Sequence, residues 1–90
     1  MTLSAWVAAQ LRVRLRRKGE TMTGAAAKMG RQPNFLTRKL NPTAPSPREL
    51  SLADIEQLAR RVLDVDPLEI FRAPIPEQEV AAEDEWRDDW

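Results

Sequence analysis

The chain contains neither cysteine nor histidine, and these two absences remove the commonest kinds of reactive site. Without cysteine there is no disulfide framework, and without either residue there is no zinc site of the usual Cys/His kind. Cysteine–histidine nucleophiles and imidazole acid–base chemistry are excluded for the same reason. The remaining side chains show no spacing that sets a base beside a nucleophile or gathers oxygen ligands, so we predict no enzyme, no cofactor and no metal site.

Long apolar runs are also missing. No stretch of about 18 apolar residues is present, and the first 17 residues have their apolar part before their charges, the reverse of a secretory signal. We therefore expect a cytoplasmic protein with no membrane partner. A chain of 90 residues is expected to form one domain with little room for an enclosed cavity, which favours a binding surface over a catalytic pocket.

The chain has no net charge, but this balance conceals a strong polarity along the sequence. Residues 1–48 carry ten basic residues and one acid, a net charge of +9, and residues 49–90 carry the opposite charge of −9. Division after residue 72 gives +6 for the first part and −6 for residues 73–90. This asymmetry predicts a polyanionic partner for the first part and an acidic segment after it.

Apolar periodicity, caps and helix breakers predict an all-α fold with five helices and no strands. The first helix, which ends at Lys18, repeats an apolar residue every four positions. The second is capped by Thr21 and stopped by Gly30 in the left-handed conformation. The third spans about residues 33–40, with Pro33 at its first position, because the donor that proline lacks would be unpaired there.

The last two predicted helices follow a proline-rich loop. Ser51 opens a capping box ahead of a strongly periodic apolar helix. Asp66 caps a short fifth helix that is expected to carry Leu68, Ile70 and Phe71. These helices complete a predicted domain over residues 1–72.

Residues 73–90 form an acidic tail with seven acids, one base and two tryptophans, Trp86 and Trp90. One interpretation is a disordered tail with a tryptophan resting on the core or on a second subunit. A second is that the tail lies against the basic face as a mimic of DNA and suppresses non-specific binding. In a third, Trp86 and Trp90 supply a dimer contact. The sequence leaves these three interpretations open.

The spacing of three residues suggests a helix-turn-helix. Counted from Met22, Ala26 is the fifth residue, Gly30 the ninth and Leu36 the fifteenth. A small residue is needed where the helices cross, a residue tolerant of positive φ in the turn, and a large apolar group to lock the second helix onto the first. With these residues the chain resembles the lambda-repressor-like (Cro-like) helix-turn-helix family over roughly residues 7–71.

The later apolar pattern resembles the family's fourth and fifth helices, and residues 36–41 resemble the recognition-helix ending of phage and prophage repressors. The chain departs from the family at three positions: Met22 stands where glutamine is usual, and Arg31 and Lys39 stand where apolar residues are usual. Leu40 is expected to take over the packing role of the residue that Lys39 replaces.

The resemblance implies a compact five-helix DNA-binding domain with its turn near residues 30–32, in which the helix at 33–40 reads the major groove. Asn34 can then pair bidentately with adenine and Arg38 with guanine. The implied base-contact residues are Gln32, Pro33, Asn34 and Arg38. The implied phosphate-contact residues are Thr21 and Met22, through backbone donors, and Arg31, Thr37, Lys39 and Arg48.

We therefore predict a sequence-specific double-stranded DNA-binding transcription regulator, a repressor of the phage or prophage type that acts in phage immunity and is associated with the nucleoid when bound. It is expected to bind its operator as a homodimer, because one recognition helix reads only a few bases. The alternative is a protein-interaction module, an antitoxin or anti-regulator, whose acidic aromatic tail folds on a basic partner. No small-molecule substrate is indicated.

Overall fold

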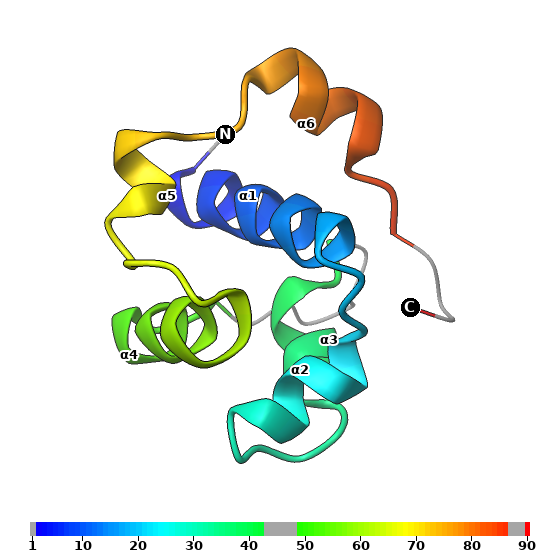
Figure 1. The fold of residues 1–90 in the computed structure, drawn as a ribbon. Helices are drawn as coiled ribbons and strands as arrows, with labels where there is room; N and C mark the ends of the chain where they lie inside the picture. The colour runs from blue at the N-terminus through cyan, green and yellow to red at the C-terminus, as the bar shows by residue number, and fades with distance from the viewer. Residues whose placement is uncertain (1, 43–48, 87–89) are drawn as a thin grey trace.

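The computed structural model describes residues 2–42, 49–86 and 90, and within these residues the protein is helical and contains no strand, as the sequence predicts. Figure 1 shows a central helix with a helical pair beneath it and a further helix above it. No helix in the described ranges is long and apolar enough to cross a membrane. The helices are α1 (Leu3–Arg17), α2 (Met22–Lys28), α3 (Phe35–Leu40), α4 (Leu52–Gln57), the π-helical stretch η1 (Leu58–Leu63), α5 (Glu69–Arg72) and α6 (Glu77–Glu83).

The central helix is α1. Thr2 caps it, since the Thr2 Oγ1 accepts a hydrogen bond from the amide of Ala5 at 3.1 Å. Its predicted apolar stripe is buried except at the first turn, where Leu3 is 70% exposed. The buried part of the stripe joins apolar residues of α2, α3, α4, η1 and α5 in one hydrophobic core.

The helices α2 and α3 follow one another across a short turn at residues 29–34, where the sequence predicts a turn between two helices. Thr21 caps α2 through a 2.9 Å hydrogen bond from the Gly24 amide, and Gly30 adopts the predicted positive φ of 71°. The other two residues at the strict positions, Ala26 and Leu36, are both completely buried, as is Met22 at the start of α2. Tight packing of α2 against α3 follows from these buried contacts.

The third helix begins two residues later than predicted. The amide of Phe35 donates to the carbonyl of Gln32 at 3.0 Å, so Pro33 and Asn34 form a turn ahead of the helix. The first α-helical hydrogen bond of this segment runs from the Arg38 amide to the Asn34 carbonyl at 3.1 Å. Asn34 therefore occupies the cap position of α3, although its side chain makes no capping hydrogen bond.

The segment after the proline-rich loop confirms the predicted capping box, in which Ser51 and Asp54 cap each other's backbone amides at 3.0 and 3.2 Å. The α4 helix continues directly as η1. The fifth helix begins at Glu69 rather than directly after Asp66, because the Asp66 carboxylate first closes a turn by accepting a hydrogen bond from the Leu68 amide.

Only one of the three apolar residues assigned to the fifth helix enters the core. Ile70 is completely buried, whereas Leu68 and Phe71 are 51% and 44% exposed. Because α5 is a single turn, it can direct only a narrow face toward the core.

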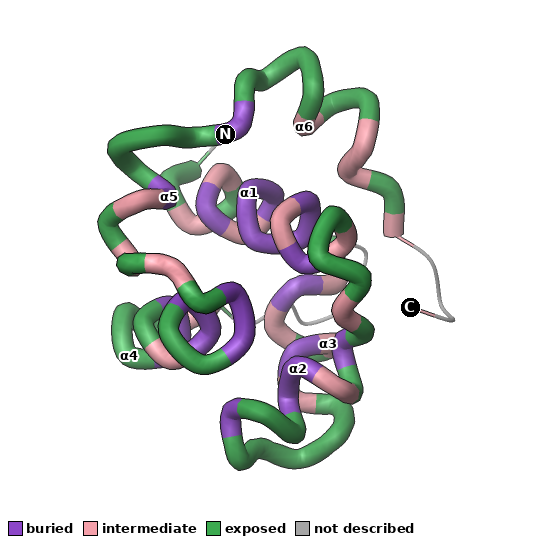
Figure 2. Tube along the Cα trace, in the orientation of Figure 1, coloured by how far each residue is buried: buried purple, intermediate pink, exposed green. Residues whose placement is uncertain are grey.

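No pattern in the sequence predicts α6, which lies within the segment expected to be a tail. This helix has no side-chain cap and no fully buried residue, and Figure 2 shows its surface as mostly exposed. Ile75 anchors the chain just before it, since the Gln10 side chain donates to the Ile75 carbonyl and accepts from the Ile75 amide, both at 2.9 Å. The α6 helix itself contacts α1 through charged side chains, described below.

Candidate nucleic-acid interface

The four predicted base-contact residues lie on one exposed edge of the molecule. Gln32, Pro33 and Asn34 form the turn before α3, and Arg38 follows one helical turn after Asn34; all four are exposed. Figure 1 shows this turn at the end of the molecule opposite α6. In the described part of the chain, neither the Asn34 amide nor the Arg38 guanidinium has a side-chain hydrogen bond or ion pair. Their donors and acceptors are available to a ligand.

The helix-turn-helix stretch from residue 21 to residue 42 contains four basic residues and no acid. Lys28 pairs with Glu20, and Arg31 and Lys39 both face the carboxylate of Asp54. Within the described ranges, Arg38 is therefore the one basic residue of this stretch without an acidic partner.

Arg31 and Lys39 are turned toward the protein. The Arg31 Nη2 lies 3.4 Å from the Asp54 Oδ1, and its guanidinium lies 4.8 Å from the centroid of the Phe35 ring. The Lys39 Nζ lies 3.8 Å from the Asp54 Oδ2 and donates to the Glu49 carbonyl at 3.0 Å. Asp54 is buried, so these two basic residues neutralise it and join the α2–α3 turn and α3 to the start of α4.

The remaining predicted phosphate contacts are placed unevenly. Thr21 is exposed, but its hydroxyl is engaged in capping α2. Met22 is completely buried, which leaves only its backbone amide for a phosphate. Thr37 is half-buried in α3, and Arg48 lies outside the described residues.

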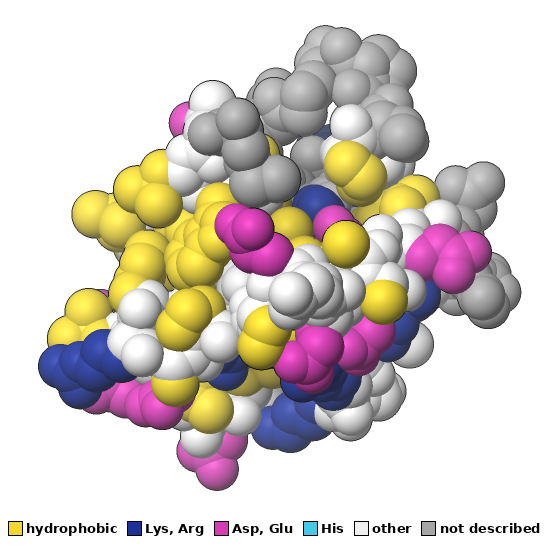
Figure 3. Space-filling view, turned by 90° about the horizontal axis from the view of Figure 1, so that it is seen from above, with side chains coloured by type: hydrophobic (Ala, Val, Ile, Leu, Met, Phe, Trp, Pro, Cys, Tyr) yellow, Lys and Arg dark blue, Asp and Glu magenta, His cyan; other side chains and the backbone are white. Residues whose placement is uncertain are grey.

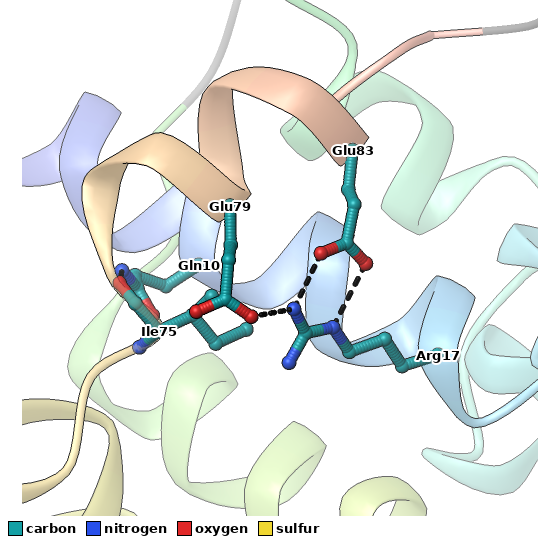
Figure 4. Close-up of polar contacts among 5 residues, drawn as sticks. All are labelled: Gln10, Arg17, Ile75, Glu79 and Glu83. Carbon is teal, nitrogen blue, oxygen red and sulfur yellow. Dashed lines mark hydrogen bonds and ion pairs between the residues drawn. The ribbon is translucent and has the colours of Figure 1, made fainter.

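The basic residues of α1 are bound by the chain itself. The Arg17 guanidinium forms ion pairs with Glu83 and, at 2.9 Å, with Glu79, as Figure 4 shows. Arg14 donates to the Ala73 carbonyl at 2.8 Å, and Lys18 donates to the Val62 carbonyl. Most of these basic side chains are therefore bound by groups of the segment from residue 73 onward.

These contacts change the ionisation of the groups involved. Hydrogen bonds from Arg17 lower the pKa of the Glu83 carboxyl, and the reciprocal bonds to Glu83 and Glu79 raise the pKa of Arg17. The pKa of Arg14 is lowered, chiefly because burial disfavours its charged form.

Arg12 makes a buried ion pair with the C-terminal segment. Its Nε and Nη2 donate to the two carboxylate oxygens of Asp84 at 2.7 and 2.8 Å, and its Nη1 donates to the Leu40 carbonyl at 2.8 Å. No local pattern in the sequence distinguishes Arg12 from the other basic residues near it. The equal and opposite charges of residues 1–72 and 73–90 are the signal that could have indicated this pairing.

Trp86 and Trp90 pack against the core of their own chain. Their rings lie 5.3 Å apart between centroids, and the Arg16 guanidinium lies 4.6 Å from the centroid of the Trp90 ring. The Trp90 Nε1 donates to the Glu20 carbonyl at 3.0 Å. Both tryptophans therefore take part in contacts between the C-terminal segment and the rest of the same chain.

An apolar groove of about 550 Å³ lies between the start of α1, the end of α3 and the start of α4. Its rim includes the exposed side chains of Leu3, Leu52 and Phe71, and the Phe71 ring stacks on Trp6 with 5.9 Å between centroids. Figure 3 shows hydrophobic side chains gathered on one side of the molecule seen from above. Leu3 and Leu52 are 70% and 83% exposed, so the rim of this groove is open to solvent.

Comparison of the chain with protein-family models, with curated proteins and with solved structures finds no match in any of the three. The helix-turn-helix resemblance therefore depends on the residues and spacing of this chain.

Proposed function

We propose that the protein is a sequence-specific double-stranded DNA-binding regulator of transcription, a repressor of the lambda-repressor-like (Cro-like) type that acts in the cytoplasm. In this proposal residues 1–72 are the DNA-binding domain. One observation carries it: the polar groups of Gln32 and Asn34, in the turn before α3, and of Arg38, one helical turn after Asn34, lie exposed without side-chain partners in the described ranges. Amide groups just before a short helix and a guanidinium on its exposed side suit the base edges of the major groove.

In the proposed complex, the start of α3 enters the major groove. Arg38 pairs with guanine and Asn34 with adenine, while the Pro33 ring packs on a thymine methyl group. Phosphates flanking this site are contacted by Thr37 and by the amides around Thr21. Arg31 and Lys39 contribute long-range attraction rather than direct contacts, since Asp54 already holds them.

The operator is expected to contain two half-sites about 34 to 36 Å apart, which requires a homodimer. Because Trp86 and Trp90 pack on their own chain, we assign the second copy to the exposed apolar groove around Leu3, Leu52 and Phe71. Analytical sedimentation of the wild type and of Leu52→Ser, each with and without a DNA duplex, measures the oligomeric state and so tests this assignment. A Leu52→Ser variant that dimerises as the wild type does would refute it.

The test begins with selection of bound sequences from random duplex DNA. Arg38→Ala is then expected to lower the preference for the selected duplex over a scrambled one by about 1 to 3 kcal/mol, roughly 5- to 160-fold. Arg61→Ala is the matched control, because it removes the same charge from an exposed position of η1. Equal affinity of the wild type for selected and scrambled duplexes would refute the proposal.

The protein-interaction alternative has less support, because the acidic segment on which it depends already lies against α1 of the same chain. A double Asn34→Ala and Arg38→Ala variant that retains a protein partner, together with a wild type that binds no DNA, would favour it.

A further inference from the structure

Two residues of the C-terminal segment reach the two ends of the helix-turn-helix unit. Trp90 bonds to the Glu20 carbonyl, directly before the cap of α2. Asp84 binds Arg12, which in turn donates to the carbonyl of Leu40, the last residue of α3. The entry to α2 and the exit from α3 are therefore both connected to residues that follow α6.

The connection through Arg12 is the stronger of the two. The Arg12 side chain is only 9% exposed, and Asp84 is the one carboxylate of the described ranges that forms an ion pair with it. A buried guanidinium is stable only with a countercharge and well-made hydrogen bonds, and the two-point geometry with Asp84 provides both. The orientation of Arg12 thus depends on Asp84.

The third helix in turn depends on Arg12. The last carbonyls of a helix have no partner within it, and Arg12 satisfies the one at Leu40. Because α3 has only six residues, its own hydrogen bonds stabilise it weakly, and contacts with α1 and α2 decide its position.

We propose that Arg12 and Asp84 are positioning residues for the DNA-reading edge: Asp84 orients Arg12, and Arg12 holds the end of α3, which carries Arg38 and follows Asn34. The consequence for DNA rests on the proposed function, whereas the consequence for α3 does not require DNA. The acidic segment then supports the helix-turn-helix from behind α1, at a distance from its exposed edge.

The neighbouring residue Glu83 provides a matched control. Glu83 and Asp84 each bind an arginine of α1, but the Glu83–Arg17 pair is exposed, with 41% of the Arg17 side chain accessible, and does not reach α3. Exposed pairs of this kind contribute little to stability. Removal of the carboxylate at position 83 and removal of the one at position 84 change the net charge by the same amount. Only the removal at position 84 affects a residue that is bonded to α3.

Hydrogen exchange of the full chain tests the connection without DNA. In Asp84→Asn, exchange at the amides of Arg38 and Asn41, which bond to carbonyls of the α3 segment, is expected to accelerate about tenfold or more. Glu83→Gln is expected to change these rates less than about twofold. Asp84→Glu should restore most of the protection, because it keeps the carboxylate.

Equal effects of Asp84→Asn and Glu83→Gln on α3 would overturn the proposal. If Asp84→Asn unfolds the whole chain, the double variant Arg12→Met and Asp84→Leu replaces the pair by apolar groups and keeps the core filled. This variant still lacks the bond to the Leu40 carbonyl, so α3 must exchange faster in it as well. Unchanged α3 exchange in the folded double variant would also overturn the proposal.

The DNA arm uses the selected duplex and its scrambled counterpart. Asp84→Asn is expected to reduce the preference for the selected duplex about tenfold, whereas its affinity for the scrambled duplex should match that of Glu83→Gln. Faster α3 exchange with undiminished preference would refute the positioning role. A wild type without any preference would refute the proposed function, and the exchange arm would still decide the link between Asp84 and α3.

Discussion

The basic residues of α1 and those of the α2–α3 unit have different uses, although both stretches look alike in the sequence. In α1 and its C-cap, the five basic residues from Arg12 to Lys18 each contact another part of the chain, mostly the C-terminal segment. In α2–α3, Arg38 has no such partner within the described ranges. Charge density along a sequence therefore identifies a basic segment but not the surface that is available to a polyanion.

The largest expected effect is on stability and comes from breaking the buried ion pair between Arg12 of α1 and Asp84. Asp84→Ala leaves the Arg12 charge buried and unpaired, which should lower the free energy of unfolding by about 3 to 5 kcal/mol. Urea denaturation measures the loss. Glu79→Ala removes an exposed partner of Arg17 and is expected to have a much smaller effect. Equal losses in both variants would contradict the distinction between buried and exposed pairs.

A salt titration of DNA binding sharpens the comparison. A positive charge at the DNA interface displaces counterions from the surrounding phosphates, so its loss should reduce the slope of log K against log salt concentration by up to about 0.9. Arg38→Gln is expected to show this reduction, and Arg17→Gln should leave the slope unchanged, because Glu79 and Glu83 already neutralise Arg17. A reduced slope for both variants would mean that the basic face of α1 also contacts DNA.

The smallest expected effect is a response of α6 to acid. Because Arg17 lowers the pKa of Glu83, the stabilisation from this pair is fully present above the pKa of Glu83 in the unfolded chain. It is lost as the pH falls through the lower pKa of the folded protein. In an NMR titration, the backbone amide signal of Val80 in α6 should therefore change at a pH below the range in which glutamates ordinarily titrate. Glu83→Gln should remove this change. The α2–α3 stretch from residue 21 to residue 42 contains no acid and should respond less.

Local signals in the sequence predict most of the fold. The caps at Thr21 and Ser51 and the turn at Gly30 depend on residues within a few positions of each other, and the structure confirms all three. The onset of the third and fifth helices is less predictable, because a proline is equally compatible with the turn that precedes each helix.

Contacts between distant residues are what the sequence does not reveal. Asp84 lies 72 positions from Arg12, and no local pattern distinguishes it from its acidic neighbours. The same limit applies to the candidate site. Spacing suggests a helix-turn-helix, and the family resemblance implies that Gln32 to Asn34 and Arg38 face the bases. The turning of Arg31 and Lys39 toward Asp54, by contrast, depends on how α4 packs.

The pairing of Gln10 with Ile75 has a consequence for how the C-terminal segment is aligned. The Gln10 amide engages both the N–H and the C=O of a single residue, a two-point match of the same kind that an asparagine makes with adenine. Nine residues after Ile75, the carboxylate of Asp84 makes a second two-point match, with the guanidinium of Arg12. If the C-terminal segment slid along α1 by one residue, both pairs of hydrogen bonds would be lost. The two pairs therefore fix the register of this segment against α1.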